Sequence, residues 1–290
     1  MITLWRRLPV VVRAVVSGWL VTSVGTGLWV LLTIANQKYF TSLPWAMLPT
    51  AGYLWLLWRY LRGEGWPRET AEARRESLRA NRLSPEVWSA AIGSGLLGLI
   101  WVLVVQQVLN RMVRLPQQIV PDTSHIPAVT LVGLLFMAAI VAGVVEEAAF
   151  RGYMQGPIEK RHGPVAGILV TGVMFGFGHF THPEVTVVLM PYYVAVAAVY
   201  GGLAYITNSI LPSVVLHAGG NMFVFLGQFG AGRSEWQATA APLVWETGPD
   251  ATFVMTVVVA FVLGAAVFWA YAGLAAAVRA ETNGAGRLRS

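Results

Sequence analysis

The sequence predicts an all-α, polytopic membrane protein, with about eight transmembrane helices and both termini in the cytoplasm. The first observation is composition: hydrophobic residues make up 56% of the 290 residues and charged residues 12%, whereas an ordinary soluble domain is roughly 25% charged. The mean hydropathy of +0.60 agrees with this. The second observation is a set of eight apolar segments, and the third is an uneven distribution of basic residues between them. Soluble globular, disordered and fibrous proteins are excluded as classes.

The apolar segments each approach the roughly 20 residues that a helix needs to cross a bilayer. Their approximate bounds are 14–35, 43–58, 87–109, 127–150, 164–180, 185–206, 210–228 and 251–278. The first segment follows basic residues and has no small-residue cleavage site, so we expect a membrane anchor and not a removable signal peptide. We expect residues 1–290 to form a single membrane domain.

Basic residues predict the orientation. With a cytoplasmic N-terminus and eight alternating spans, 16 Lys and Arg residues lie on the cytoplasmic side and four lie outside. Cytoplasmic loops of membrane proteins carry such an excess, so the net charge of +6 indicates topology and not nucleic-acid binding. Seven of the 16 lie in segment 59–86, which we expect to be cytoplasmic and helical over Glu69–Arg82. This segment is either a solvated linker or a surface for lipid headgroups or a partner.

Charged side chains within the spans indicate where function resides. A charge at the bilayer centre costs roughly 2.5–3.5 kcal/mol on insertion scales, so it is rare without a functional reason. Nearly all polar side chains at membrane level fall in the fourth, fifth and seventh segments. They are Glu146, Glu147, Arg151, His179, His217 and Asn221.

Helical geometry groups these side chains. Residues four apart share a helix face, so Glu147 is expected to pair with Arg151, and His217 to lie one turn from Asn221. Glu146 lies about 100° around the helix from Glu147 and should point toward a neighbouring helix.

The fourth and fifth segments should run antiparallel, with a turn near residues 162–163. Glu146 lies 16 residues before His162 and His179 lies 17 after it, so an equal rise per residue places Glu146 and His179 at one level. We therefore expect the fourth helix to continue beyond Arg151 into the cytoplasm, with a kink at Gly156-Pro157.

Small residues on the same segments favour close helix packing, because they let membrane helices approach each other. Two of them share a face with His179, and the others lie on the fourth and seventh segments. The positions are Gly143, Gly172, Gly176, Gly219 and Gly220.

A carboxylate, two imidazoles and an amide, in a chain without cysteine, indicate activation of water for acyl hydrolysis. Glu146 is the candidate general base, with His179 sharing the water. His217 and Asn221 are candidate donors to a developing oxyanion. The sequence lacks His-Glu-x-x-His, which a zinc protease of that class requires. Neither Asp lies within a span, and Ser94 lacks the Gly-x-Ser-x-Gly spacing, which excludes an aspartyl protease and disfavours a serine protease.

Three motifs in order carry a resemblance to a known family. They are Glu146-Glu147-Ala-Ala-Phe-Arg151, Phe175-Gly-Phe-Gly-His179 and His217-Ala-Gly-Gly-Asn221. Together they resemble the CAAX prenyl protease and bacteriocin-processing (CPBP or ABI) family over about residues 140–225, which would be the catalytic core helices. The resemblance implies a glutamate-type intramembrane endopeptidase acting near the cytoplasmic membrane face.

The resemblance also implies roles for individual residues. Glu146 and His179 would activate water, His217 and Asn221 would form the oxyanion hole, and Glu147 and Arg151 would support the site. Phe175 is either a core residue or part of a substrate groove. The substrate would be a membrane-associated peptide or protein in a prokaryotic cell membrane, and a lipidated terminus is one candidate feature of it.

Four alternatives stay open. One or two glutamates and two histidines can also hold Zn²⁺, although the family resemblance favours metal-free catalysis without a cofactor. Glu147 and Arg151 can be a buried ion pair with no catalytic role. The chain can be a non-catalytic scaffold or immunity protein of the same fold. It can also be a transporter that uses Glu146 and His179 as a proton relay, although no inverted repeat is visible in the sequence.

Overall fold

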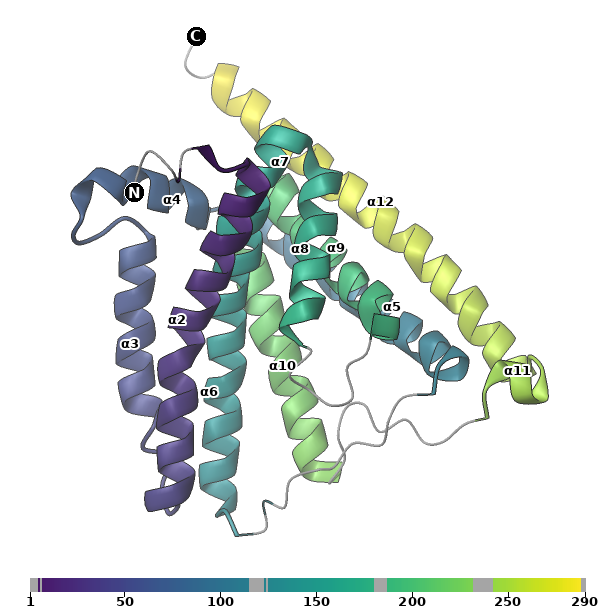
Figure 1. The fold of residues 1–290 in the computed structure, drawn as a ribbon. Coiled ribbons are helices and arrows are strands. Elements are labelled where there is room, and N and C mark those ends of the chain that lie inside the picture. The colour runs from purple at the N-terminus through teal and green to yellow at the C-terminus, as the bar shows by residue number, and fades with distance from the viewer. Residues whose placement is uncertain are drawn as a thin grey trace. The chain divides into compact units, whose positions relative to one another are not determined.

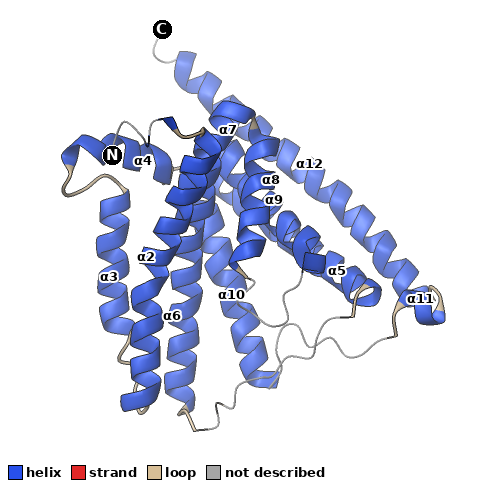
Figure 2. Cartoon of the chain, in the orientation of Figure 1, coloured by secondary structure: helices blue, strands red, loops and turns tan. Residues whose placement is uncertain are grey.

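The protein is described by a computed structural model that covers Trp5 and residues 7–114, 123, 125–179, 187–231 and 242–287, without the side chains of 228–231 and 285–287. Every regular element in these ranges is helical (Figure 1 and Figure 2), which confirms the all-α prediction. The α-helices are α2 (Val10–Tyr39), α3 (Met47–Leu61), α4 (Ala71–Leu78), α5 (Pro85–Met112), α6 (Ala128–Glu146), α7 (Gly156–His162), α8 (Pro164–Gly178), α9 (Met190–Thr207), α10 (Leu211–Ala231), α11 (Val244–Thr247) and α12 (Ala251–Arg287). Two 3₁₀ turns, η1 (Arg68–Thr70) and η3 (Val187–Leu189), and a π-helical stretch, η2 (Glu147–Gln155), complete the description.

Each of the eight predicted apolar segments overlaps a helix, although residues 180, 185 and 186 at two of the predicted ends lie outside the described residues. Among the described residues, five helical stretches are long and apolar enough to cross a membrane: Val10–Tyr39, Pro85–Met112, Ala128–His162, Val187–Thr207 and Ala251–Gly284. Two shorter apolar helices span Pro164–Gly178 and Leu211–Gly227. The chain is therefore an integral, multi-pass membrane protein. Helix α3 has 15 residues, fewer than the roughly 20 of a full span.

The chain divides into two compact units, each built from segments that are distant in sequence. The first unit consists of Met1–Ala80, Ile119–Gly167 and Ser213–Ser234, and the second of Asn81–Gln118, Ile168–Pro212 and Glu235–Ser290. The first unit thus holds α2, α3, α4, α6, η2, α7 and most of α10. The second holds α5, most of α8, α9, α11 and α12.

In the first unit, α2 packs along α6 and η2. Glycines allow this approach, because Gly18 lies against Met154 and Gly25 lies directly against Val145, where an added Cβ would clash. The core between α2, α3 and α6 is apolar, and its buried members are Trp29, Ala46, Leu54, Leu134, Met137, Val141 and Val145.

In the second unit, α5 packs along α12 and α9. Polar side chains of the helices satisfy backbone carbonyls across these contacts. The Tyr271 hydroxyl donates to the Val199 carbonyl at 2.8 Å, and the Trp101 indole donates to the Ala260 carbonyl at 3.0 Å. Large apolar side chains such as Phe268 and Trp269 remain exposed on α12, as expected for a helix whose surroundings are lipid.

The charged segment 59–86 is less helical than predicted. The helix expected over Glu69–Arg82 is present only as α4, Ala71–Leu78, preceded by the turn η1. It ends at Leu78 because Arg79 adopts a left-handed conformation with φ 56° and ψ 34°. A non-glycine residue is uncommon in this region, so tertiary contacts of Arg79 must favour it.

Candidate active site

The helix that carries the two glutamates changes its winding at those residues. Residues 128–162 form one uninterrupted helical stretch, as α6, η2 and α7. This confirms that the fourth predicted span continues past Arg151. The π-helical part begins at Glu147, directly after Glu146, and ends at Gln155. Such π-helical turns are rare and occur frequently at functional sites.

Glu147 and Arg151 form the predicted ion pair. Arg151 Nη1 lies 3.2 Å from Glu147 Oε1, and both side chains are completely buried. Two opposite charges in an interior neutralise each other, and removing either one would leave the other with a large desolvation cost. The pair therefore has a structural function whatever its catalytic role.

His217 of α10 bridges the two glutamates. Its Nδ1 lies 2.8 Å from Glu147 Oε1, and its Nε2 lies 3.8 Å from Glu146 Oε2. Because a carboxylate accepts hydrogen bonds, Nδ1 carries the proton of the shorter contact, and Nε2 faces Glu146. The sequence predicted that Glu146 points to a neighbouring helix, and it does, toward His217. That His217 also contacts Glu147 was not predicted.

The two glutamates differ in exposure. The Glu147 side chain is 0% exposed, whereas the Glu146 side chain is 20% exposed. Glu147 is therefore enclosed together with Arg151 and His217, and Glu146 is the more exposed of the two carboxylates.

A glycine allows α6 and α10 to lie close enough for these contacts. A Cβ added to Gly143 would lie 2.8 Å from both the Cβ and the backbone nitrogen of Ala218, the residue after His217. This confirms the predicted role of Gly143. The same prediction for Gly219 is wrong, because an added Cβ there would meet nothing within 4 Å. Asn221 lies on α10, one turn beyond His217, and is partly exposed.

His179 belongs to the second unit and directly follows α8. Its Nδ1 lies 2.8 Å from the Phe175 carbonyl oxygen. A carbonyl can only accept, so Nδ1 carries the proton of this contact. The ring of His179 contacts two aromatic rings, with centroid distances of 4.6 Å to Phe175 and 4.7 Å to Tyr193.

Close packing in the second unit supports this aromatic group. Gly172 and Gly176 lie against α9, next to Ala197 and Met190, as the small-residue pattern predicted. Phe175 is 4% exposed and lies 5.8 Å, centroid to centroid, from Tyr193. Tyr193 was not predicted as a site residue. In the sequence, the adjacent Tyr192 and Tyr193 resemble ordinary aromatic residues at a membrane interface. Only the fold shows that the Tyr193 ring contacts His179.

A cofactor or metal would need several ligands in one place. Among the residues that the structure describes, no group of three or more His, Cys, Asp and Glu side chains is arranged to hold a metal ion. Glu146, Glu147 and His217 carry oxygen and nitrogen donor atoms of the kind that bind Zn²⁺, and a chelator tests whether activity depends on such an ion.

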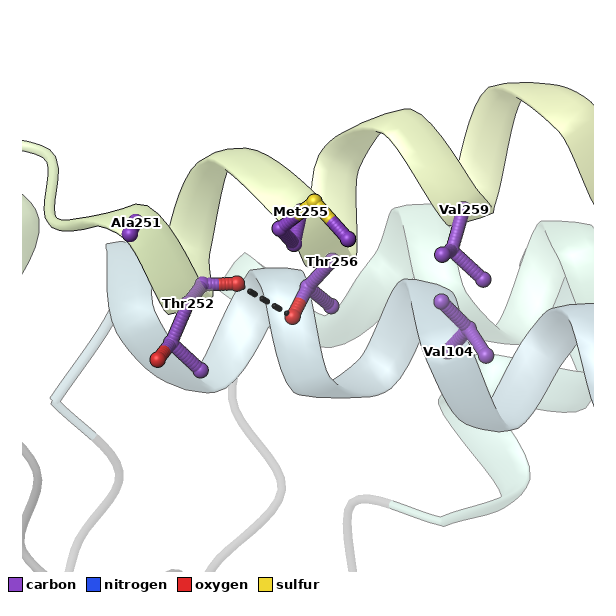
Figure 3. A pocket seen from close by; sticks show the side chains of 6 residues that line it. All are labelled: Val104, Ala251, Thr252, Met255, Thr256 and Val259. Carbon is purple, nitrogen blue, oxygen red and sulfur yellow. Dashed lines mark hydrogen bonds between the residues drawn. The ribbon is translucent and has the colours of Figure 1, made fainter.

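An open groove of about 430 Å³ lies elsewhere, between α5 and α12 of the second unit (Figure 3). It is lined by Val104, Ala251, Thr252, Met255, Thr256 and Val259. Thr252 and Thr256 are the polar members, and the Thr256 hydroxyl donates to the Thr252 carbonyl at 2.8 Å. No predicted site residue lines the groove, so it is not where we place the chemistry.

Comparison with known proteins adds one finding. Residues 128–223 match the family model described as type II CAAX prenyl endopeptidase, Rce1-like. No curated protein and no solved structure matches the chain. The matched range includes both glutamates, Arg151, His179, His217 and Asn221.

Proposed function

We propose that this chain, whose residues 128–223 match the model of the Rce1-like CAAX prenyl endopeptidase family of peptide-bond hydrolases, is an intramembrane endopeptidase with Glu146 as the general base. The observation that carries the proposal is the buried His217 imidazole between Glu146 and Glu147. A base, an imidazole and a third group that orients it are the usual parts of a hydrolytic site.

The two glutamates take different roles in this proposal. Glu146 is partly exposed and has His217 Nε2 at 3.8 Å, so it removes a proton from the attacking water. Glu147 is buried between Arg151 and His217, so it orients the imidazole and stays out of contact with the substrate.

His217 and Asn221 supply the oxyanion hole. With Nδ1 engaged by Glu147, Nε2 is the nitrogen of His217 that can donate to the developing oxyanion when it carries a proton. Asn221 adds an amide donor one helical turn away on α10. For His179, whose Nδ1 contacts the Phe175 carbonyl oxygen, we keep the role proposed from the sequence, which is to share the attacking water with Glu146.

The topology in the proposal has eight spans, cytoplasmic termini and a site open to the cytoplasmic leaflet of a prokaryotic cell membrane. The helix from Ala128 to His162 supports it, because its C-terminal end carries Lys160, Arg161 and His162, as expected of a cytoplasmic end. The family implies a protein or peptide substrate, and we propose one associated with the membrane, with a lipidated C-terminus as the first to test.

The test is cleavage of a quenched fluorescent peptide with a lipidated C-terminus by purified protein in detergent. Glu146→Gln should lower kcat by roughly 10²–10⁴-fold, the usual contribution of a general base, and should still bind the peptide. Glu86→Gln is the control, because Glu86 is an exposed glutamate in the first turn of α5. Equal cleavage by wild type and Glu146→Gln would refute the role of Glu146. If the wild type binds the peptide without cleaving it, a scaffold is favoured. If the wild type conducts protons in liposomes, a transporter is favoured.

A further inference from the structure

The cytoplasmic segment 59–86 lies directly against the π-helical stretch η2. A Cβ added to Gly152, in the middle of η2, would lie 2.8 Å from the Ser77 carbonyl oxygen and 3.2 Å from that of Leu78. Real Cβ atoms essentially never come as close as the first of these distances. The end of α4 therefore touches the backbone of η2 in the turn after Glu147 and Arg151.

Tyr153, the next residue of η2, contacts two other parts of the same segment. Its hydroxyl lies 3.5 Å from the carbonyl oxygen of Leu61, at the end of α3, and 3.4 Å from that of Arg74, in α4. One hydroxyl proton is thus shared between two carbonyls. The contact ties the beginning of the charged segment, and not only its end, to η2.

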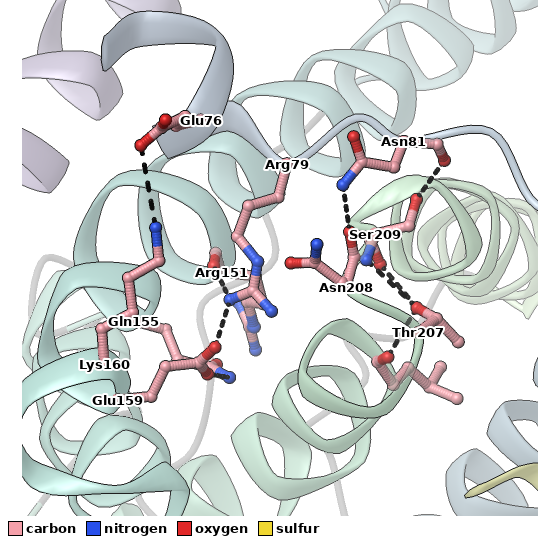
Figure 4. A network of polar contacts seen from close by, with 11 residues as sticks. Glu76, Arg79, Asn81, Arg151, Gln155, Glu159, Lys160, Thr207, Asn208 and Ser209 are labelled. Carbon is pink, nitrogen blue, oxygen red and sulfur yellow. Dashed lines mark hydrogen bonds and ion pairs between the residues drawn. The ribbon is translucent and has the colours of Figure 1, made fainter. Parts of the chain in front are cut away.

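Arg79 makes the strongest of these contacts (Figure 4). Its guanidinium is only 4% exposed, and Nη1 lies 2.9 Å from Glu159 Oε1 and 3.5 Å from the carbonyl oxygen of Arg151. The other carboxylate oxygen of Glu159 accepts a hydrogen bond of 3.0 Å from the Gln155 amide. Arg79 therefore connects η2 to α7, across the last turns of the helix that carries the site.

Glu159 balances the charge of the buried Arg79 guanidinium. Burial lowers the pKa of the Arg79 guanidinium, and Glu159 opposes the shift. A guanidinium stays charged in proteins, so the ion pair offsets the cost of burying it. The left-handed conformation of Arg79 is what turns its side chain onto η2 and α7 immediately after α4 ends.

We propose that Arg79 is a positioning residue for the active site: it holds the cytoplasmic segment on η2 and so maintains the winding that aligns Glu147 and Arg151. Because π-helical winding is rare, tertiary contacts must favour it here, and Gly152, Tyr153 and Arg79 supply them. The proposal rests on the proposed function for its catalytic consequence, but its structural part can be measured separately.

The test uses the full chain in detergent with two readouts. The first is cleavage of the lipidated peptide, and the second is hydrogen–deuterium exchange of the amides of residues 147–155. Arg79→Gln should lower kcat by roughly 10- to 100-fold with little change in KM, since small misplacements of catalytic groups cost about this much. It should also accelerate exchange within 147–155. Arg75→Gln is the matched control, because Arg75 is an exposed arginine on α4.

Two further variants keep the proposal falsifiable. Arg79→Lys keeps the positive charge but not the planar fork of donors, so it should fold and show intermediate exchange and kcat. Arg79→Gln with Glu159→Gln removes both charges, so it leaves no uncompensated carboxylate. We expect kcat of the double variant to remain low and its exchange within 147–155 to remain fast. Restoration of kcat and of slow exchange would show that Arg79 only balances the charge of Glu159.

The two proposals can fail separately. If no tested peptide is cleaved by the wild type, the proposed function is in question, while exchange within 147–155 still decides the role of Arg79. If Arg79→Gln and Arg79→Lys both exchange and cleave like the wild type, the positioning role is refuted and the hydrolytic function stands.

Discussion

His217 Nδ1 lies 2.8 Å from Glu147 Oε1, in an interior where the His217 side chain is 7% exposed and that of Glu147 is 0% exposed. The imidazole is therefore fixed by a carboxylate that is itself paired with Arg151. This chain of contacts gives the ring a single orientation, with Nε2 toward Glu146. An oriented imidazole beside an accessible carboxylate is the arrangement on which the predictions below depend.

Glu147→Gln should lower both stability and activity. The variant keeps the shape of the side chain but leaves Arg151 without its carboxylate, and breaking a buried pair in this way costs about 3–5 kcal/mol. Unfolding in mixed micelles measures the stability. Glu146→Gln is the matched control, because it leaves the pair of Glu147 and Arg151 intact and should unfold like the wild type while losing activity. Equal stability of the two variants would contradict the assigned roles.

Asn221→Ala should lower kcat by roughly 10²–10³-fold with little effect on KM, the usual loss for one oxyanion-hole donor. Steady-state cleavage of the lipidated peptide measures it. Gly219→Ala, on the same helix, is the control, because an added Cβ at Gly219 meets nothing within 4 Å. A rise in KM at constant kcat would instead assign Asn221 to substrate binding.

Gly143→Ala should move α10 away from α6, because the new Cβ would lie 2.8 Å from Ala218. Overpacking of this kind typically costs about 1–3 kcal/mol, and it should also reduce kcat, since Ala218 follows His217. Thermal unfolding and cleavage are measured together. Gly27→Ala, on α2, has open space around it and should behave like the wild type. Wild-type stability of Gly143→Ala would show that α6 and α10 are not packed as described.

Tyr193 should contribute to activity through the contact of its ring with His179. The ring of Tyr193 lies 4.7 Å from that of His179, and such pairs contribute about 0.5–1.5 kcal/mol. Tyr193→Ala should therefore lower kcat by up to about tenfold, and Tyr193→Phe, which keeps the ring, should retain most of the activity. The melting temperature of each variant separates a local effect at His179 from general damage. An equal loss of kcat in both variants would show that the hydroxyl, and not the ring, is required.

The start of α12 should show a pH-dependent contribution to stability. A hydrogen bond from Arg111 and one from the Phe253 backbone lower the pKa of Asp250. A carboxyl with a lowered pKa stabilises the folded state above its unfolded pKa, about 4, and this contribution is lost as the pH falls through the folded pKa. The melting temperature of Asp250→Asn should thus lie below that of the wild type at pH 7, and the difference should shrink as the pH falls below about 4. A constant difference would rule out the ion pair as its source.

Much of the fold could be predicted from the sequence, because long apolar segments have few alternatives to helices in a membrane. The pair of Glu147 and Arg151, the continuation of the helix to His162 and the close packing at Gly143 were also predictable from spacing. The π-helical winding of η2 was not. It depends on contacts such as Ser77 on Gly152, which join residues distant in sequence and leave no local pattern.

The contacts of the candidate site were only partly predictable. The motifs identified His217, but its position between Glu146 and Glu147 depends on how α10 packs against α6, which a sequence period does not specify. Arg79 was one of seven basic residues in a charged segment. Nothing in that segment distinguishes a buried arginine from a solvated one, because only its left-handed backbone turns the side chain inward.

We propose that Glu146 activates water without a metal ion. Cleavage of the lipidated peptide should be measured for wild type and for Glu146→Ala, each with and without a strong chelator. We expect wild-type activity to be unchanged by the chelator and Glu146→Ala to be inactive in both conditions. Loss of wild-type activity in the chelator, restored by added Zn²⁺, would contradict the claim.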